Sequence, residues 1–357
     1  MKDRKNTKQS KYDTAKIPLN LIEKELIDSN RQQQNCNKNV RTKEQHSTYS
    51  GIDSKNAPVK KENKFFRVFF SIILVISMLC GALSGYSYSL CSKINYTKSA
   101  SNTTLDLTNI KNKVYNVLLI GTDKEEDNGT SRSDSMILVT INTKEKAIKL
   151  TSFMRDLWVE IPGHDHSRLN AAYSIGGPEL LIKTISKNFD IRIDNYILVN
   201  FDMFKDLIDG IGGVSIDITD AEAEFINRTT HAKVTPGENT LNGDYALIYC
   251  RIRKLDSDFM RTQRQRKVIT AIVNKIRTQS ILKTANIASD VLPFITTDIS
   301  PLKMTIKLFG AISYLDYSTE QIRIPADGTY QNKTINSQAV LVPDIEENIS
   351  IVKDFIY

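Results

Sequence analysis

The sequence predicts an α/β domain with a mixed central β-sheet that helices flank on both faces, preceded by a polar tail and one transmembrane helix. Three observations support this. Short apolar runs of strand type alternate with segments of helical spacing from residue 114 onward. Residues 144–146 form a hairpin turn between two of these runs, so the sheet is not wholly parallel. Residues 65–90 are nearly free of charge, which is typical of a membrane span.

The N-terminal part divides into three segments. Residues 1–64 are rich in Lys, Asn, Gln and Ser and poor in aromatic residues, which predicts a disordered tail. Residues 65–90 form the predicted transmembrane helix, and 91–112 form a polar stalk. A cleaved signal peptide is the alternative, but its charged leader is normally short. Here 64 residues precede the span, so we expect an uncleaved anchor.

Charge predicts the orientation of this anchor. Residues 1–67 hold 16 Lys and Arg against 8 Asp and Glu, which leaves 32 bases and 33 acids in the rest of the chain. The positive-inside rule therefore places the tail in the cytoplasm and residues 113–357 outside the cell. The basic tail sets topology in this interpretation, and we expect no nucleic-acid partner. A nucleotide is also excluded as a ligand outside the membrane, where no nucleotide pool is available.

The strands of the outer domain are predicted from apolar runs bounded by turns. The first covers 115–121 and ends at a glycine, as a buried strand does. Runs 135–142 and 147–153 follow it across the hairpin turn. Two further strand-like runs occupy 196–200 and 214–218.

The helices are predicted from apolar spacing of three and four residues. They cover 178–188, which Gly176-Gly177-Pro178 introduces, 203–208, and 261–278. The last of these carries Val268, Ile272 and Ile276 on one face. A turn-rich segment at 237–243 leads into a short helix and then a strand that carries 249–253. We expect residues 281–357 to complete the same domain.

A cluster of planar cationic and amide groups predicts a binding site for a multiply charged anion. Guanidinium groups supply forked donors that match phosphate oxygens. On the predicted strand, alternate residues share a face, and on the following helix, residues four apart do so. Surface ion pairs with Asp256 and Asp258 are the alternative interpretation. The predicted phosphate-binding residues of this cluster are Arg251, Arg253, Arg261, Arg264 and Gln265.

Two aspartates at neighbouring strand ends predict a metal site. Asp123 follows the first strand, and Asp134, after Arg132, opens the second. Two carboxylates with retained waters suit Mg²⁺, or Mn²⁺ in its place, particularly beside a diphosphate. Aspartates at strand ends also serve as caps and turns, so this pattern alone is not specific.

Polar residues after the third strand extend the predicted site. Arg155 is a further phosphate ligand, and Asn170 positions either an arginine or a substrate oxygen. Asp156 orients an arginine, accepts a proton, or forms a structural ion pair. No serine or cysteine has an evident base partner, so the sequence does not support covalent catalysis.

Eight ordered motifs across residues 114–280 resemble the LytR–CpsA–Psr family of cell-wall phosphotransferases. They are Asn-Val-Leu-Leu-Ile-Gly-Thr-Asp123, Arg132-Ser-Asp134-Ser-Met, Arg155-Asp156, Leu169-Asn170-Ala-Ala-Tyr, Gly210-Ile-Gly-Gly-Val, Leu241-Asn-Gly, Tyr249-Cys-Arg-Ile-Arg253 and Asp258-Phe-Met-Arg-Thr-Gln-Arg-Gln265. Two positions depart from many relatives. Met154 stands where they have proline, and an acidic stretch follows Asp123 where they have arginine.

The resemblance implies transfer of a glycopolymer, such as a teichoic acid or capsular polysaccharide, from an undecaprenyl-diphosphate carrier to peptidoglycan in a Gram-positive-type envelope. Asp123 and Asp134 match the family's Mg²⁺-associated aspartates. The diphosphate-binding set is matched by Arg155, Arg251, Arg253, Arg261 and Gln265, and we add Arg132, Asn170 and Arg264 as substrate-binding residues. The expected catalytic residues are Asp134, Arg155, Asp156, Arg251 and Arg253.

The predicted mechanism is in-line phosphoryl transfer to a sugar hydroxyl, with polyprenyl phosphate as the leaving group and Asp134 or Asp156 as the base. We expect an apolar groove for the lipid, lined by the helix that starts at Pro178 and by Val268 and Ile272. Two alternatives remain, of which the first uses the same residues and the second only binds through the outer domain. One is a polyprenyl-diphosphate hydrolase, and the other is a non-catalytic envelope sensor or transcriptional attenuator.

Overall fold

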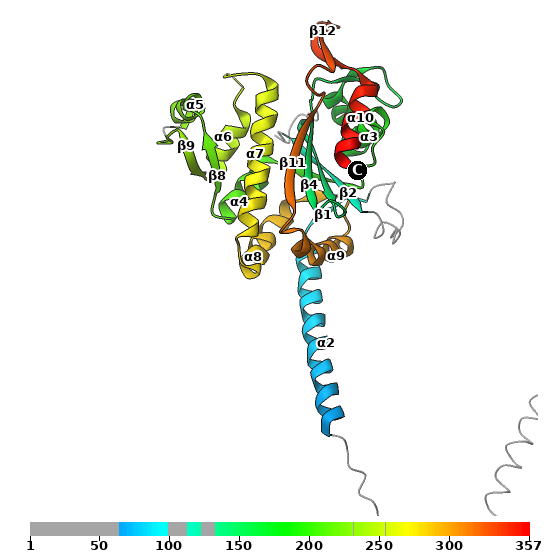
Figure 1. Ribbon diagram of the computed structural model, residues 1–357, viewed down its shortest axis with the longest axis vertical. Coiled ribbons are helices and arrows are strands. Elements are labelled where there is room, and N and C mark those ends of the chain that lie inside the picture. Colours follow the sequence, from blue (N-terminus) through cyan, green and yellow to red (C-terminus); the bar gives the residue numbers. More distant parts are fainter. Residues whose placement is uncertain (1–63, 99–112, 123–132, 231, 254) are drawn as a thin grey trace, which may run out of the picture. The chain divides into compact units, whose positions relative to one another are not determined.

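A computed structural model of the chain describes residues 64–98, 113–122, 133–230, 232–253 and 255–357 (Figure 1). The chain divides into two compact units, 1–68 and 69–357, and the second contains every element discussed below except the start of α2. The predicted tail, apart from Lys64, lies outside the described residues, as does most of the predicted stalk.

A long helix, α2 (Lys64–Cys91), covers the predicted membrane span. Its segment Ile72–Cys91 is long and apolar enough to cross a membrane, with a mean hydropathy of 1.6. Length and composition therefore agree with the predicted anchor.

Within the described residues, seven strands form one mixed sheet in the order β1-β10-β7-β2-β3-β4-β11. The central strands β2, β3 and β4 are antiparallel, whereas β7 runs parallel to β2 and β11 runs parallel to β4. The sequence prediction of a mixed sheet is thus confirmed. The strands are β1 (Asn95–Tyr96), β2 (Val114–Thr122), β3 (Ser133–Asn142), β4 (Ala147–Phe153), β7 (Asn195–Val199), β10 (Thr296–Thr297) and β11 (Ser318–Ile324).

In the part of the chain that the structure describes, three short antiparallel ribbons lie outside this sheet. They pair β5 (Trp158–Val159) with β6 (Ser167–Arg168), β8 (Val214–Ile218) with β9 (Gly237–Leu241), and β12 (Tyr330–Ile335) with β13 (Gln338–Pro343). The predicted strand at 214–218 therefore exists but belongs to a ribbon. The helices of the domain are α3 (Leu169–Phe189), α4 (Phe201–Gly210), α5 (Asp220–Thr230), α6 (Gly243–Arg251), α7 (Asp258–Arg277), α8 (Ile281–Val291), α9 (Pro301–Ala311) and α10 (Ile345–Ile356).

Side chains alternate along the strands, so both faces of the sheet carry apolar residues, and helices cover both faces. Leu118 and Ile120 of β2 are fully buried in a core shared with α3 and α10. Leu119, between them, points to the other face, where α4, α6 and α7 pack (Figure 1). The ends of β2, β4 and β7 and the start of β3 meet at one edge of the sheet, which is where the polar motifs lie.

The predicted strand over 249–253 is wrong, because this segment is the end of helix α6 and the loop after it. The Asn242 side chain caps the helix by accepting a hydrogen bond from the Tyr245 N–H at 2.9 Å. Ala246, Tyr249 and Cys250 supply the buried helical face. Gly243 allows α6 to approach α4 closely, since a Cβ there would lie 2.5 Å from the Lys205 carbonyl oxygen.

Two predicted helices begin earlier than expected. Helix α3 starts at Leu169, and its backbone departs from helical geometry at Gly176 and Gly177, where φ is +61° at Gly177. The Pro178 signal therefore marks the start of the second helical segment of α3, after this kink, as the sequence predicts. Helix α7 begins at Asp258, three residues before the predicted start, so Asp258 lies in its first turn.

Candidate functional site

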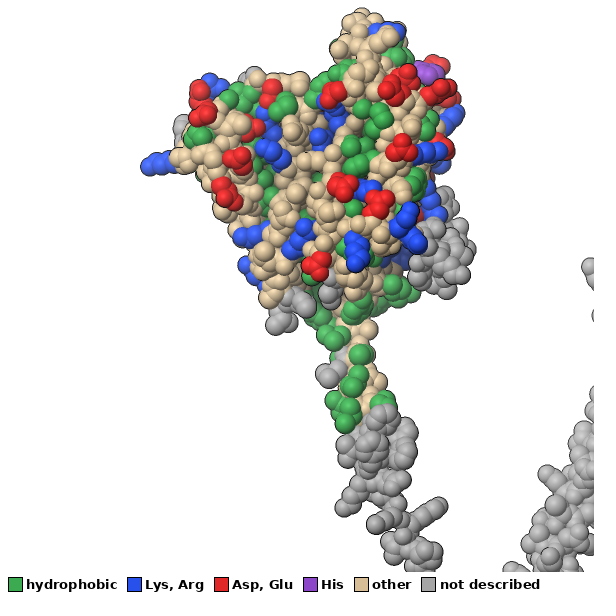
Figure 2. Space-filling model, viewed as in Figure 1, with side chains coloured by type: hydrophobic (Ala, Val, Ile, Leu, Met, Phe, Trp, Pro, Cys, Tyr) green, Lys and Arg blue, Asp and Glu red, His purple; other side chains and the backbone are tan. Residues whose placement is uncertain are grey.

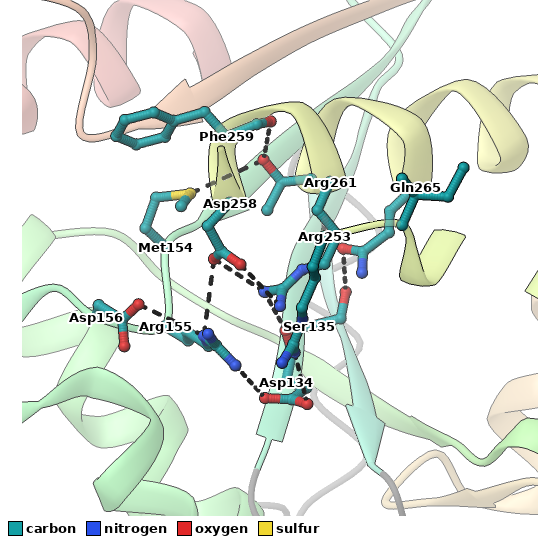
Figure 3. A network of polar contacts seen from close by, with 12 residues as sticks. Asp134, Ser135, Met154, Arg155, Asp156, Arg253, Asp258, Phe259, Arg261 and Gln265 are labelled. Carbon is teal, nitrogen blue, oxygen red and sulfur yellow. Dashed lines mark hydrogen bonds and ion pairs between the residues drawn. The ribbon is translucent and has the colours of Figure 1, made fainter. Parts of the chain in front are cut away.

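Three arginines converge on Asp134 at the edge of the sheet (Figure 3). Arg155, after β4, donates from Nη1 to Asp134 Oδ1 at 2.9 Å, and Arg253, after α6, donates from Nη2 to Oδ2 at 3.0 Å. Arg261 of α7 donates from Nη2 to the Asp134 carbonyl oxygen at 3.2 Å. Residues from four parts of the chain thus form one cationic cluster around a strand end.

Two further carboxylates border the same cluster. Asp258 accepts a hydrogen bond from Arg261 Nη2 at 2.9 Å, and its Oδ2 lies 3.7 Å from Arg155 Nε. Asp156 lies 3.4 Å from Arg155 Nε and 3.4 Å from Arg168 Nη1. Asp156 therefore contacts two arginines, as an orienting carboxylate does.

The cluster shifts the pKa values of two of its carboxyl groups in opposite directions. Burial raises the pKa of Asp134, but the Arg155 hydrogen bond and the charge of Arg253 outweigh burial and hold this pKa below its ordinary value. Burial also raises the pKa of Asp258, and there the charges of Arg261 and Arg155 do not offset it, so the pKa stays above the ordinary range. Asp258 is therefore the stronger base of the two.

The buried guanidinium of Arg261 is only partly satisfied. Its side chain is 2% exposed, and burial lowers its pKa to about 10. Its Nε and Nη1 make no hydrogen bond of good geometry within the described structure, although Nη1 lies 2.8 Å from Asp258 Oδ1. The buried Nε of Arg155 likewise has no hydrogen-bond partner in the described structure. Buried donors without acceptors are costly, and an anion would satisfy them.

Arg251 and Gln265 lie beside the cluster rather than on a face shared with Arg253. The Arg251 guanidinium lies 4.7 Å from the centroid of the Phe201 ring, and Gln265 accepts a hydrogen bond from Ser135 Oγ at 3.0 Å. Both residues line a cavity of about 260 Å³ between the sheet and helices α4, α6 and α7. They form its polar end.

The rest of this cavity is apolar, and we call it the apolar groove. Its walls include Leu119, Ile197, Leu207, Ile269, Ile272 and Ile295. The sequence prediction placed Ile272 in such a groove correctly, but two parts of the prediction were wrong. Val268 is fully buried in the core, and the α3 segment after Pro178 does not line the groove, because α3 covers the opposite face of the sheet.

A second cavity, of about 310 Å³, lies between the start of α7 and the β12–β13 ribbon. We call it the polar cavity after the polar residues on its two sides; most of its lining surface is apolar, and Met154, Phe259, Val340 and Leu341 contribute to it. Asp156, Ser257 and Asp258 line one side, and Asn332 and Lys333 line the other. A hydrogen bond of 2.9 Å from the Leu341 N–H to the Asp156 carbonyl oxygen joins the ribbon to the cluster. The site thus offers an apolar groove and a polar cavity beside one group of arginines.

Three predicted site residues take different places. Arg264 is 3% exposed and donates to Glu222 at 2.6 Å, to the Ile252 carbonyl oxygen at 3.2 Å, and to Asp256. It contacts none of the residues around Asp134. Asn170 is buried, and its N–H donates to the Arg155 carbonyl oxygen at 3.2 Å, which ties α3 to the loop that carries Arg155. Asp123 and Arg132 lie outside the described residues.

Sequence reasoning missed Ser135 and Phe201 as partners of Gln265 and Arg251, and it treated Asp258 only as a surface partner. Ser135 and Phe201 carry no distinctive signal, because their roles depend on packing between distant elements. Asp258 did carry one, since an aspartate three residues before an arginine at a helix start forms an i, i+3 pair.

The fold and the cluster define an α/β protein with an arginine-rich site beside an apolar groove. Residues 82–354 match the LytR_cpsA_psr family. The chain is 31% identical over 277 residues to the polyisoprenyl-teichoic acid–peptidoglycan teichoic acid transferase TagT of Bacillus subtilis (strain 168), which covers 73% of this chain and 83% of TagT. The chain therefore belongs to the LytR_cpsA_psr family.

Solved structures of TagT share the fold. One, of TagT bound to LIIa-WTA, matches with a TM-score of 0.61 and 30% identity over 73% of this chain and 98% of that one. Another, of the protein YwtF (TagT) with bound octaprenyl pyrophosphate lipid, matches with a TM-score of 0.56 and 28% identity over 73% and 99% of the two chains.

Proposed function

We propose that this protein is a membrane-anchored phosphotransferase that moves a teichoic-acid-type or capsular glycopolymer from undecaprenyl diphosphate to peptidoglycan. The observation that carries the proposal is the partly satisfied arginine cluster, which lies beside both an apolar groove and a polar cavity. The names of the relatives, which include a teichoic acid transferase and a structure with octaprenyl pyrophosphate, support the same reaction.

The arginines hold the diphosphate in this proposal. Arg155 and Arg261 each bury donors that have no acceptor, and Arg253 is 46% exposed at the mouth of the cluster. Phosphate oxygens accept forked hydrogen bonds from guanidinium groups and offset their charge. Arg251 and Gln265 bind from the groove side, at the junction between the diphosphate and its lipid tail.

The polyprenyl chain occupies the apolar groove. The groove begins at Arg251 and Gln265, and its apolar wall continues along α7 through Ile269 and Ile272. This arrangement suits a ligand with a charged head and a long apolar tail, because each part meets groups of its own polarity.

The acceptor sugar enters the polar cavity, where Asp258 takes its proton. Asp134 is a weak base because its pKa is lowered, whereas the raised pKa of Asp258 favours proton uptake. The sugar hydroxyl oxygen bonds to the polymer-side phosphorus while the bond from this phosphorus to the bridging oxygen breaks. The hydroxyl proton passes to Asp258, and polyprenyl phosphate leaves with the bond's electrons.

The carboxylate of Asp134 fits a role as a Mg²⁺ or Mn²⁺ ligand. Its side chain is 36% exposed and offers oxygens at the edge of the cluster, where diphosphate oxygens and water could complete the ligand set. The described residues contain no group of three or more metal-binding side chains, so substrate oxygens are needed. A bound divalent ion would neutralise charge that develops on the diphosphate. We expect Asp134→Asn to abolish metal dependence while the unfolding transition is preserved.

The chain acts at the outer surface of the cell membrane in this proposal. The excess of Lys and Arg before residue 68 favours a cytoplasmic N-terminus and an external catalytic domain. Protease accessibility of an epitope at each end, measured in intact cells, tests this orientation.

Transfer is tested with the full chain in nanodiscs, lipid-linked polymer and peptidoglycan. We expect polymer to become attached to peptidoglycan and polyprenyl phosphate to be released only when the acceptor is present. Release that ignores the acceptor would instead establish a hydrolase.

Arg251→Ala and Arg253→Ala should each weaken diphosphate binding by about 1.5–3 kcal/mol, because each removes a charge-assisted contact. Wild-type activity in both variants would refute this site.

The remaining alternative, a sensor, predicts a different result in cells. Deletion of residues 1–60, with the anchor and its flanking Lys and Arg kept, should leave polymer attachment intact if the outer domain is the enzyme. Loss of attachment, with normal amounts of the anchored protein, would favour signalling through the tail.

A further inference from the structure

Helix α9 carries a row of large apolar side chains on its exposed face. Leu302 is 47% exposed, Ile306 54% and Phe309 49%. Their spacing of four and three residues places them on one side of the helix. Thr305 lies on the same side of the helix, one turn after Leu302, and is 6% exposed because it packs against Cys91 at the end of α2. A soluble surface rarely gathers such residues without a partner, so the row marks an interaction surface.

This row lies next to the end of α2. Thr305 lies against the side chain of Cys91, the last residue of α2, and Cys91 is fully buried. Leu90 and Ile94 pack on Leu292, in the 3₁₀ turn Leu292–Phe294 that precedes β10. Figure 2 shows hydrophobic side chains at this end of the domain, around the junction with α2.

Polar contacts fix the same junction. Lys93 Nζ lies 3.1 Å from Ser289 Oγ of α8, and the Asn95 N–H donates to the Ile295 carbonyl oxygen at 2.9 Å. Strand β1 then pairs with β10 in the main sheet. The outer end of α2 is thus held by the domain rather than joined to it through a free linker.

The position of the bilayer surface follows from α2. Among its described side chains, almost all from Ile72 to Tyr88 are exposed, Tyr88 by 50%, and they become buried in the domain at Leu90. These two residues are only about 3 Å apart along a helix axis. Tyr86 and Tyr88 are residues of the type that lies at the headgroup level of a membrane. A bilayer around α2 therefore ends close to the residues that α9 contacts.

The apolar groove reaches the same end of the domain. Ile295 lines the groove, and its neighbour Phe294 is 50% exposed beside Leu292. Ile295 also packs against Leu90, Ile94 and Leu292, so it joins the lining of the groove to the contact with the end of α2. A lipid tail that leaves the groove there would meet an apolar surface rather than water.

We propose that α9 and Phe294 insert into the outer interface of the bilayer that contains α2, so that the catalytic domain rests on the membrane with its lipid groove open to it. The proposal rests on the membrane-anchored topology proposed above. The occupant of this face is lipid because the face is continuous with the membrane-spanning helix. Lys303, between Leu302 and the inward Thr305, can extend its ammonium group to lipid phosphates.

Tryptophan quenching tests this contact in the full chain reconstituted in nanodiscs. The chain has one tryptophan, Trp158, whose emission provides the baseline. Ile306→Trp and Phe309→Trp each add a fluorophore to the α9 row, and Met260→Trp, at a site 41% exposed in the first turn of α7, is the matched control. The nanodiscs contain phosphatidylcholine with bromine on the upper acyl chain, because an interfacial helix buries its apolar face about 5–10 Å deep.

We expect both α9 tryptophans to lose much of their added emission in brominated nanodiscs, while the emission added at residue 260 is unchanged. Equal emission in brominated and plain nanodiscs for both α9 variants would overturn the proposal. Quenching does not depend on turnover, so quenching without polymer transfer would refute the proposed function and leave this contact standing.

A second pair of measurements separates docking from folding. Ile306→Asp/Phe309→Asp should selectively lose transfer from long-chain polyprenyl donors in nanodiscs, whereas transfer from a short, water-soluble prenyl diphosphate donor should be retained. Equal retention of both activities would contradict a role for the contact in substrate entry. The short-chain activity also reports whether the variant is folded.

Discussion

Arg261 and Arg264 lie three residues apart on α7 and are 2% and 3% exposed, yet their surroundings differ. Arg264 donates from Nε, Nη1 and Nη2 to Glu222, Asp256 and the Ile252 carbonyl oxygen. Arg261 leaves Nε and Nη1 without good hydrogen bonds, and burial lowers its pKa to about 10. Burial and charge are alike at the two positions, so the supply of acceptors distinguishes them. Arg264 is fully paired within the fold, whereas Arg261 keeps donors that the proposed diphosphate would satisfy.

The largest effect on stability is expected for Arg264→Met. This change leaves Glu222, which is 5% exposed, without its charged partner. Removal of one member of a buried pair typically costs about 3–5 kcal/mol. Urea unfolding of the full chain measures the loss, and Arg264→Met/Glu222→Gln should recover part of it. A loss below about 1 kcal/mol would show that Arg264 is not a structural residue.

Asp258→Asn should lower the transfer rate by about 100-fold or more, because it removes the proposed base. The pKa of Asp258 is raised, so wild-type activity should fall as the pH drops through that raised value, when the carboxylate gains a proton. The variant should lack this acid limb. A rate profile from pH 4 to 8 tests this, and an unchanged limb in the variant would assign the proton to another group.

The raised pKa of Asp258 also has a consequence for stability. A folded-state pKa above the unfolded value adds stability that is complete below the unfolded pKa and is lost as the pH rises through the folded one. Asp258→Asn removes this dependence. As the pH rises from mildly acidic to neutral, the unfolding free energy of the variant should therefore increase relative to that of the wild type. Urea unfolding at several pH values provides the control for the rate measurements.

Arg261→Met should separate binding from folding. Arg261 buries an Nε without an acceptor but also pairs with Asp258, which keeps Arg155 nearby, so an apolar side chain of similar length should cost less unfolding free energy here than at Arg264. Binding of polyprenyl diphosphate should weaken by about 10- to 150-fold, which corresponds to 1.5–3 kcal/mol. Titration calorimetry measures the binding. Arg228→Met, at a site 68% exposed on α5, is the matched control and should bind normally.

The smallest effect is expected for Arg253→Lys. Arg253 is 46% exposed, and lysine keeps the charge but loses the fork that reaches Asp134 and a phosphate together. We expect binding to weaken by no more than about tenfold. If Arg253→Lys is as damaging as Arg253→Ala, then geometry rather than charge dominates at this position. Competition binding with a fluorescent polyprenyl diphosphate gives both values.

Local patterns predicted much of the fold. The runs at 115–121, 135–142 and 147–153 became β2, β3 and β4, because alternate side chains of these runs fill two different faces. The prediction of a strand at 249–253 was wrong for a local reason. Tyr249 and Cys250 were taken as strand residues, although Asn242 and the spacing from Ala246 are typical of a capped helix. The alternation that placed Arg251 and Arg253 on one face was therefore absent.

The cluster could be predicted in composition but not in arrangement. Asp134, Arg155 and Arg261 stand in motifs that can be recognised in the sequence, so their residue types and order could be predicted. The role of Arg264 depends on Glu222, which lies 42 residues earlier on α5. No local pattern links these two residues, since the pair forms only when α5 and α7 are packed. The polar cavity likewise needs β12 and β13, which come from a region without a chemical motif.

The pairing of β11 beside β4 has a consequence for biogenesis. These strands join residues 318–324 to residues 147–153, and the ribbon that follows β11 supplies a wall of the polar cavity. Contacts so distant in sequence form late, because a long loop must close first. With the outward orientation proposed above, the β4–β11 pair can form only after nearly the whole polypeptide has crossed the membrane. The proposed site would therefore be complete only at the end of translocation. A partly exported chain would lack a wall of the polar cavity and would not act on a lipid-linked polymer.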